Sequence, residues 1–113
     1  MIRKKGQQKM FKDKFDQSRR LAWIRSKCQA NFRDEEWNLT WEEFCHFWSD
    51  LKLWRQRGRA EQNLVLTRYD PEGAWDRDNC CIINRKAQLT IGIKRKWNLP
   101  EEEFYKDAIW YEK

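Results

Sequence analysis

Residues 63–96 constrain the fold more than any other part of the chain. An apolar run is followed by a polar loop rich in turn-forming residues, and a second apolar run comes after the loop. This order predicts two antiparallel strands at about 63–67 and 80–84. A segment with five basic residues follows at once, and it predicts a helix at about 84–96. We therefore expect a β-hairpin that leads into a basic helix, a ββα unit.

The beginning of the chain predicts one long helix. A basic arm, residues 1–6, ends at a glycine, and the stretch 7–30 contains neither proline nor glycine. Apolar residues recur there at spacings of three, four or seven, which is typical of an amphipathic helix with a basic outer surface. The expected apolar seam consists of Phe11, Phe15, Leu21, Ile24 and Cys28.

Two similar sequence motifs predict the starts of two further helices. Thr40 is followed three residues later by Glu43, which is the pattern of a capping box. It predicts a helix from about 41 to 54 with an aromatic face, made of Phe44, Phe47, Trp48, Leu51 and Trp54. Near the end, Pro100 takes the place of the threonine, and proline suits the first turn of a helix. A short helix over 100–112 is therefore expected.

These elements predict a single, mostly helical α+β domain over 1–113. A chain of 113 residues can bury one core but not two. The helical part is expected at 7–54, before the ββα unit and the C-terminal helix. The sequence has no apolar run that could span a membrane and no apolar signal segment, so we expect a cytoplasmic protein without membrane partners. The eight tryptophans can fill the core, stack on bases or anchor an interface.

The charge of the chain is unevenly distributed. The net charge is +6, but residues 1–33 carry eleven basic and two acidic residues, and residues 34–53 carry six acidic and one basic. A polarised chain of this kind offers one face to polyanions and another to a different partner. The alternative is an ordinary solvated surface with no ligand.

The four cysteines predict free thiols. Cys28, Cys45, Cys80 and Cys81 show no CxxC spacing. A zinc site that joins some of them to His46, the single histidine, is the alternative, although it lacks the paired local spacing of structural zinc modules.

Four segments in order resemble small phage-borne proteins of the HNH endonuclease-related group. They read AWIRSKC at 22–28, LTWEEFCHFW at 39–48 and LTRYDPEGAWDRDNC at 66–80, followed by Gln88. Members of that group share, in the same order, a Trp and "RC", a "W..F..F" helix, the motif "LDRID..G.Y...NCRW" and a following Gln. The resemblance covers roughly 22–89. It implies a ββα unit that grips a nucleic-acid groove, and a phage protein acting in the bacterial host cell.

The resemblance also implies where a nuclease would hold its catalytic groups. In nuclease members a His ends the first strand, a central Asn orients the attacking water, and a helix residue binds the metal. Asn79 matches the central Asn. The strand position falls on Arg68 or Tyr69, and neither is a general base at neutral pH. The helix position falls near Asn84 or Gln88, which are poor lone metal ligands. We therefore expect no catalysis and no cofactor.

A metal-dependent nuclease with an atypical site is a third reading. It would draw on Asp70, Asp78, His46 or Asn79 to hold a metal such as Mg²⁺. Aspartates in such a loop are more often turn formers that accept backbone hydrogen bonds. Asp70, Asp76 and Asp78 are expected to act in that way.

The leading prediction is a non-catalytic DNA-binding protein. Arginine forks grip phosphates and also read guanine edges. The alternative is a small phage-encoded modulator that binds a host nuclease, polymerase or defence factor. The candidate nucleic-acid contacts are Arg3, Lys4, Lys5, Arg19, Arg20, Arg55, Arg57, Arg59, Arg68, Arg77, Arg85 and Lys86.

Overall fold

The computed structural model describes residues 14–112. In chain order its elements are α2 (Lys14–Phe32), α3 (Trp41–Phe47), α4 (Leu51–Arg55), β1 (Leu64–Arg68), β2 (Cys80–Asn84), α5 (Arg85–Lys96), the 3₁₀ helix η1 (Glu102–Tyr105) and β3 (Ile109–Trp110). Over the described residues the fold is α+β, with four α-helices and one three-stranded antiparallel sheet. The predicted arm at 1–6 and the first part of the predicted long helix lie outside the described residues.

The sheet has the strand order β1-β2-β3. Leu64 lies opposite Asn84 and Arg68 opposite Cys80, so the two predicted strands pair antiparallel as the sequence indicates. α5 begins directly after β2, because the Asn84 side chain accepts a hydrogen bond of 2.8 Å from the backbone N–H of Ala87 and so caps the helix. The predicted helix at 84–96 agrees with α5.

The predicted C-terminal helix at 100–112 is wrong. After a single 3₁₀ turn the chain extends and adds β3 to the free edge of β2, with Cys81 opposite Trp110 and Ile82 opposite Ile109. β-branched and aromatic residues favour a half-buried strand over a helix. A helix-start motif predicts where a helix begins. It does not predict that the residues after it will pair with a strand such as β2.

The predicted helix at 41–54 is divided in two. Its capping box is confirmed, because the Glu43 N–H donates to Thr40 Oγ1 at 3.1 Å and the Thr40 N–H donates to Glu43 Oε1 at 3.0 Å. α3 nevertheless ends at Phe47, and the Asp50 side chain caps a new helix, α4. A short polar side chain that bonds to the nearby backbone competes with helix continuation. The break leaves Trp48 fully buried.

The predicted apolar seam of the first helix is only partly correct within the described residues. Phe15 is half-buried, and its ring centroid lies 6.2 Å from that of Trp54. Leu21, Ile24 and Cys28 are exposed, whereas Ala22 and Ala30 are buried. Small side chains on the inner face let α2 lie close to the rest of the protein. A large apolar residue at those positions would hold the helix away.

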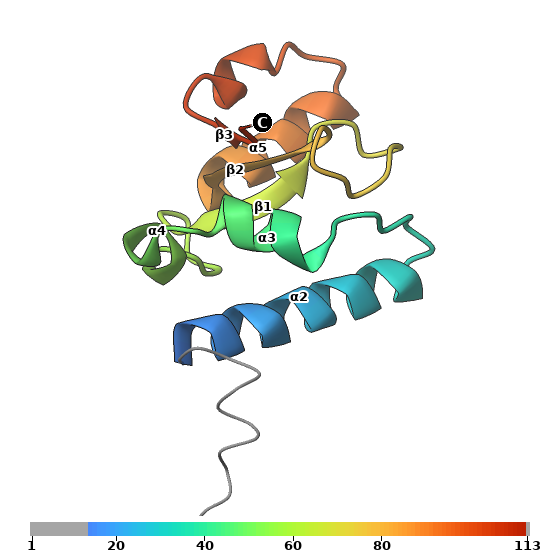
Figure 1. Ribbon diagram of the computed structural model, residues 1–113. Helices are drawn as coiled ribbons and strands as arrows, with labels where there is room; N and C mark the ends of the chain where they lie inside the picture. The colour runs from blue at the N-terminus through green and yellow to red at the C-terminus, as the bar shows by residue number, and fades with distance from the viewer. Residues whose placement is uncertain (1–13, 113) are drawn as a thin grey trace, which may run out of the picture.

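The core consists of two clusters on the two faces of the sheet. Successive β2 side chains point to opposite faces, so Cys80 and Ile82 pack with α3, whereas Cys81 and Ile83 pack with α5. Figure 1 shows the resulting layers: α2, then α3, then the sheet, then α5 and the C-terminal segment. Over residues 14–112, no helix has both the length and the apolar character needed to cross a membrane.

Most tryptophans serve this core. Trp48 belongs to the first cluster, and five half-buried rings pack against that cluster: Trp23, Trp37, Trp41, Trp54 and Trp75. Trp97 and Trp110 are exposed. The high tryptophan content is therefore explained mainly by packing.

Candidate nucleic-acid interface

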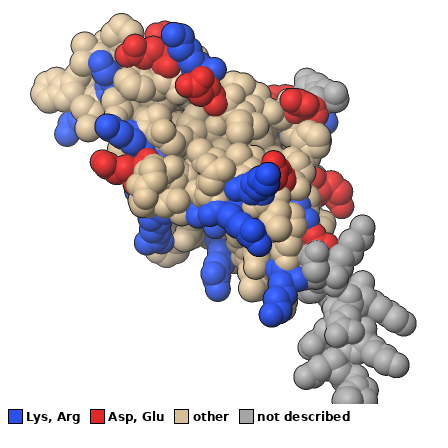
Figure 2. Space-filling model, turned by 90° about the vertical axis from the view of Figure 1, so that its left-hand side faces the viewer, with Lys and Arg blue, Asp and Glu red and all other residues tan. Residues whose placement is uncertain are grey.

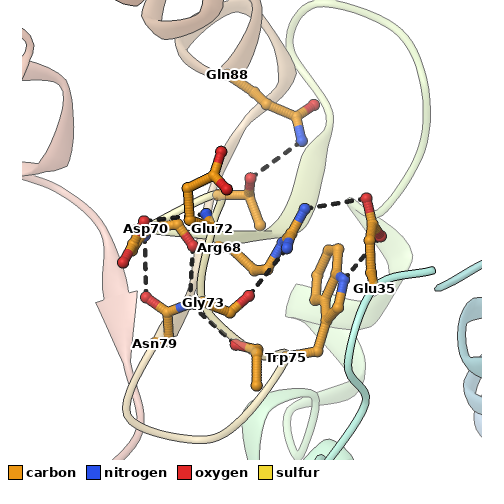
Figure 3. A network of polar contacts seen from close by, with 10 residues as sticks. Glu35, Arg68, Asp70, Glu72, Gly73, Trp75, Asn79 and Gln88 are labelled. Atoms are coloured by element: carbon orange, nitrogen blue, oxygen red, sulfur yellow. Dashed lines mark hydrogen bonds and ion pairs between the residues drawn. The ribbon is translucent and has the colours of Figure 1, made fainter. Parts of the chain in front are cut away.

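Asn79 fastens the loop between β1 and β2. Its Nδ2 donates to the carbonyl oxygens of Asp70 at 3.0 Å and Ala74 at 2.9 Å, and its Oδ1 accepts from the Asp70 N–H at 2.9 Å. A Cβ at Gly73 would lie 2.9 Å from Asn79 Nδ2, so this contact favours glycine there. Figure 3 shows the amide turned into the loop. The side chain matching the nuclease Asn is thus occupied with holding the backbone.

The loop aspartates Asp70 and Asp76 act as turn formers. Asp70 Oδ1 accepts from the Glu72 N–H at 3.0 Å, and Asp76 Oδ1 accepts from the N–H groups of Asp78 and Asn79 at 3.0 and 2.8 Å. These bonds agree with the turn-forming role that the sequence suggests. Asp78 lies on the exposed side of the loop, 4.0 Å from the Arg77 Nε.

Arg68 occupies the strand end where the nuclease pattern has a histidine. Its Nη1 donates to the Gly73 carbonyl oxygen at 2.9 Å, and its Nη2 donates to Glu35 Oε2 at 3.0 Å. The guanidinium also lies 5.1 Å from the Trp75 ring centroid, and the Trp75 indole N–H donates to Glu35 Oε1 at 3.0 Å. In Figure 3 these three side chains converge. Arg68 therefore holds the hairpin loop against the chain that follows α2.

The other proposed metal ligands are not brought together. His46 is exposed on α3, with its ring centroid 4.5 Å from that of Tyr111. Cys80 and Cys81 lie on opposite faces of the sheet, and burial raises the pKa of each thiol to about 12. Cys28 is exposed, and desolvation raises the pKa of Cys45. Within residues 14–112, no group of three or more His, Cys, Asp or Glu is arranged to hold a metal ion.

A basic cleft of about 500 Å³ lies between α2 and β1. We call it the arginine cleft, because five arginines line it: Arg25, Arg33, Arg57, Arg59 and Arg85. The first two come from α2 and the residue just after it, the next two from the loop before β1, and the last from the start of α5. In Figure 2, Lys and Arg side chains gather over the lower half of one face, and most Asp and Glu side chains lie nearer its edges.

The positive charge of the arginine cleft is not neutralised from within the described part of the chain. Among the described residues, Glu35 is the single acidic residue in the lining, and it already pairs with Arg68. Among residues 14–112, none of the five cleft arginines forms an ion pair with a carboxylate. Arg57 stacks 5.1 Å from the Trp54 ring centroid, and Arg85 donates to the Gln88 side chain. The cleft therefore concentrates positive potential and favours an anionic ligand.

The structure sorts the predicted nucleic-acid contacts into three groups. Arg57, Arg59 and Arg85 meet in the arginine cleft. Arg19 and Arg68 are committed to the fold; Arg19 is buried, pairs with Asp16 and donates to the carbonyl oxygens of Cys45 and Trp48. The remaining described candidates lie outside the cleft lining: Arg20, Arg55, Arg77 and Lys86. Arg3, Lys4 and Lys5 lie outside the described residues.

Two of these outlying candidates also make contacts within the protein. The Arg20 guanidinium lies over the rings of Trp23 and Trp41, at 4.7 and 5.1 Å from their centroids. The Arg77 Nε is 3.9 Å from Glu43 Oε2. These contacts give both arginines a role in the fold that does not need a ligand.

Sequence reasoning missed Arg25 and Arg33 as members of the site. They lie eight residues apart with Gln29 midway, so the three form one polar stripe along α2 and the turn that follows it. The spacing was visible in the sequence, but the basic residues of this helix read as a general outer surface. The other residues that line the cleft are remote in sequence. Only their proximity in the fold distinguishes this stripe from the rest of the basic surface of α2.

Comparisons with protein-family models, with curated proteins and with solved structures found no match for this chain.

Proposed function

We propose that this protein binds nucleic acid, DNA in particular, without cutting it. The observation that carries the proposal is the arginine cleft, in which five arginines converge from three parts of the chain without a free carboxylate among them. Arginine is suited to this role because its planar fork binds phosphate through two parallel hydrogen bonds. The scaffold would be a degenerate HNH-like ββα unit of phage origin, formed by β1, β2 and α5 and acting in the bacterial cytoplasm.

The chemistry of the hairpin supports binding over cleavage. A guanidinium has hydrogen-bond donors and no acceptor, so Arg68 cannot take a proton from water as a histidine would. The amide of Asn79 is engaged by three hydrogen bonds to the loop backbone. The two residues that match the catalytic positions of the nuclease pattern thus hold the loop in shape.

A binding assay with matched variants tests the proposal. Fluorescence anisotropy of labelled DNA at low salt compares the wild type with Arg25→Ala/Arg33→Ala, which removes two cleft charges from the α2 wall. Lys14→Ala/Lys27→Ala is the control, because it removes the same charge from exposed positions of α2 outside the cleft. We expect the cleft variant to lose affinity at least about tenfold and the control to lose far less. Absence of wild-type binding at low salt would overturn the proposal.

A second candidate function is binding to another protein, and the exposed face of α5 favours it. Leu89, Ile93 and Trp97 are spaced by four residues and are 46, 61 and 67% exposed. α5 carries basic residues and no acidic one, so the occupant we propose is an acidic surface of a host protein. A Cβ at Gly92 would meet nothing within 4 Å, so no contact within the described chain requires a glycine there. The close approach of a partner's backbone would require one.

Variant-dependent capture tests this second function. A nuclease-treated bacterial lysate is passed over the wild type, over Ile93→Asp and over Leu21→Asp, a control at an exposed apolar position of α2. The proposal expects one stoichiometric protein that the wild type and the control retain and that Ile93→Asp loses. A protein retained equally by all three would contradict it, and so would the absence of any stoichiometric protein.

A further inference from the structure

The size of the arginine cleft limits what can enter it. A volume of about 500 Å³ falls within the roughly 300–1,000 Å³ that sites for single small molecules occupy. A DNA duplex, whose major groove alone spans about 12 Å, does not fit into a space of that volume. A duplex can therefore touch only the mouth of the cleft. A single strand can place a nucleotide inside it.

The cleft arginines come from two separate parts of the lining. Arg25 and Arg33 line the α2 side, whereas Arg57, Arg59 and Arg85 line the side formed by the loop before β1 and the start of α5. A strand that entered the cleft would meet cationic groups from both parts of the lining. This arrangement resembles the charged grooves that track a single-stranded backbone more than a flat patch that covers one side of a duplex.

The lining also offers groups that suit an unpaired base. The half-buried rings of Trp37 and Trp75 line the cleft, with centroids 5.7 Å apart and planes 33° from parallel. Aromatic rings stack on bases of any sequence. The amide of Gln29 is there as well, and an amide can both donate to and accept from a base edge. In a duplex those edges are paired and the base faces are stacked.

We infer that the arginine cleft takes a single-stranded nucleic acid, with phosphates at the arginines from both parts of its lining and a base against Trp37 and Trp75. The inference rests on the proposed nucleic-acid-binding function and specifies the form of the ligand. Duplex binding is then weaker, because it uses only the arginines that reach the mouth.

A cleft-filling variant tests the inference without changing charge. Gln29 is an exposed position of α2 in the cleft lining, so Gln29→Trp places a bulky neutral side chain in the cleft. Leu21→Trp is the matched control, because Leu21 is exposed on the same helix and lies outside the lining. The probes are a labelled oligothymidylate of about 12 nucleotides and a duplex of the same length, at equal salt. Thermal unfolding verifies that both variants fold.

We expect the wild type to bind the single strand at least tenfold more tightly than the duplex. Gln29→Trp should lose at least tenfold in single-strand affinity, and Leu21→Trp should lose less than twofold. A duplex affinity equal to or above that of the single strand would overturn the inference and leave the proposed function standing, as would a Gln29→Trp variant that binds the single strand normally. Absence of binding to both probes at low salt would overturn the proposed function itself.

Discussion

Arg68 and Glu35, thirty-three residues apart in sequence, form an ion pair of 3.0 Å between Nη2 and Oε2. Their side chains are only 13 and 20% exposed, and the indole N–H of Trp75 completes the cluster by donating to the same carboxylate. The pair joins the end of β1 to the chain after α2. It also neutralises the acidic side chain that the described residues contribute to the lining of the arginine cleft.

Glu35→Gln separates the structural role of this pair from ligand binding. The change keeps an acceptor for Trp75 but removes the charge that pairs with Arg68. We expect the free energy of unfolding to fall by about 1–3 kcal/mol, since a charge-assisted hydrogen bond is weakened in a largely buried site. Nucleic-acid affinity should be equal or higher, because loss of the Glu35 carboxylate makes the net charge of the cleft more positive by one unit. Denaturant titration and anisotropy measure the two effects; lower affinity with unchanged stability would contradict this role.

Asn79→Asp tests whether this residue holds the loop or takes part in hydrolysis. Aspartate keeps the shape but loses the two N–H donors that bind the Asp70 and Ala74 carbonyls. We expect a loss of about 1–3 kcal/mol in unfolding free energy, with little change in the DNA affinity of the folded protein. Plasmid DNA incubated with the wild type and Mg²⁺ or Mn²⁺ should stay intact. Cleavage that disappears in Asn79→Asp would assign Asn79 to catalysis instead.

The four thiols should differ sharply in reactivity. Cys28 is exposed, Cys45 is half-buried, and Cys80 and Cys81 are fully buried. At pH 8 a disulfide reagent such as Ellman's reagent should modify Cys28 rapidly, Cys45 more slowly, and the two β2 cysteines only after denaturant is added. Mass spectrometry of the labelled peptides identifies the sites. Rapid labelling of Cys80 or Cys81 in the native protein would contradict the packing of β2.

Stability should fall as the pH rises above 9. The ordinary pKa of a cysteine thiol is 9.0, and burial raises the pKa of Cys80 and Cys81 to about 12 in the folded protein. Between these values the folded state holds more protons than the unfolded state, so alkali favours unfolding. Each thiol should contribute a slope of about −1.4 kcal/mol per pH unit in that window. Cys81→Ala should make the decline shallower; an unchanged slope would show that Cys81 ionises normally.

The sequence predicted those parts of the fold that local patterns determine. The hairpin strands follow from two apolar runs around turn residues, and the start of α3 follows from Thr40 and Glu43. The third strand could not be predicted, because β3 exists through pairing with β2. The predicted seam of α2 includes Leu21 and Ile24, whereas that part of the helix packs through Ala22 and Ala30.

The same limit applies to the candidate site. Arg57, Arg59 and Arg85 were predicted as contacts, and the structure brings them together in the cleft. Arg68 was predicted as a contact too, although its donors are taken by Glu35 and the Gly73 carbonyl. No pattern in the sequence reveals a partner thirty-three residues away. The sequence therefore identifies the basic residues, but it does not show which of them are available to bind a ligand.

The dependence of affinity on salt measures how many phosphates the arginine cleft neutralises. For single-stranded DNA, log affinity falls against log salt concentration with a slope of about 0.7 for each neutralised phosphate. We expect Arg57→Ala/Arg59→Ala to reduce the slope by about 1.4. Lys96→Ala/Lys106→Ala removes the same charge at exposed positions outside the cleft and should leave the slope nearly unchanged. Equal slopes for the wild type and the cleft variant would show that nucleic acid does not bind there.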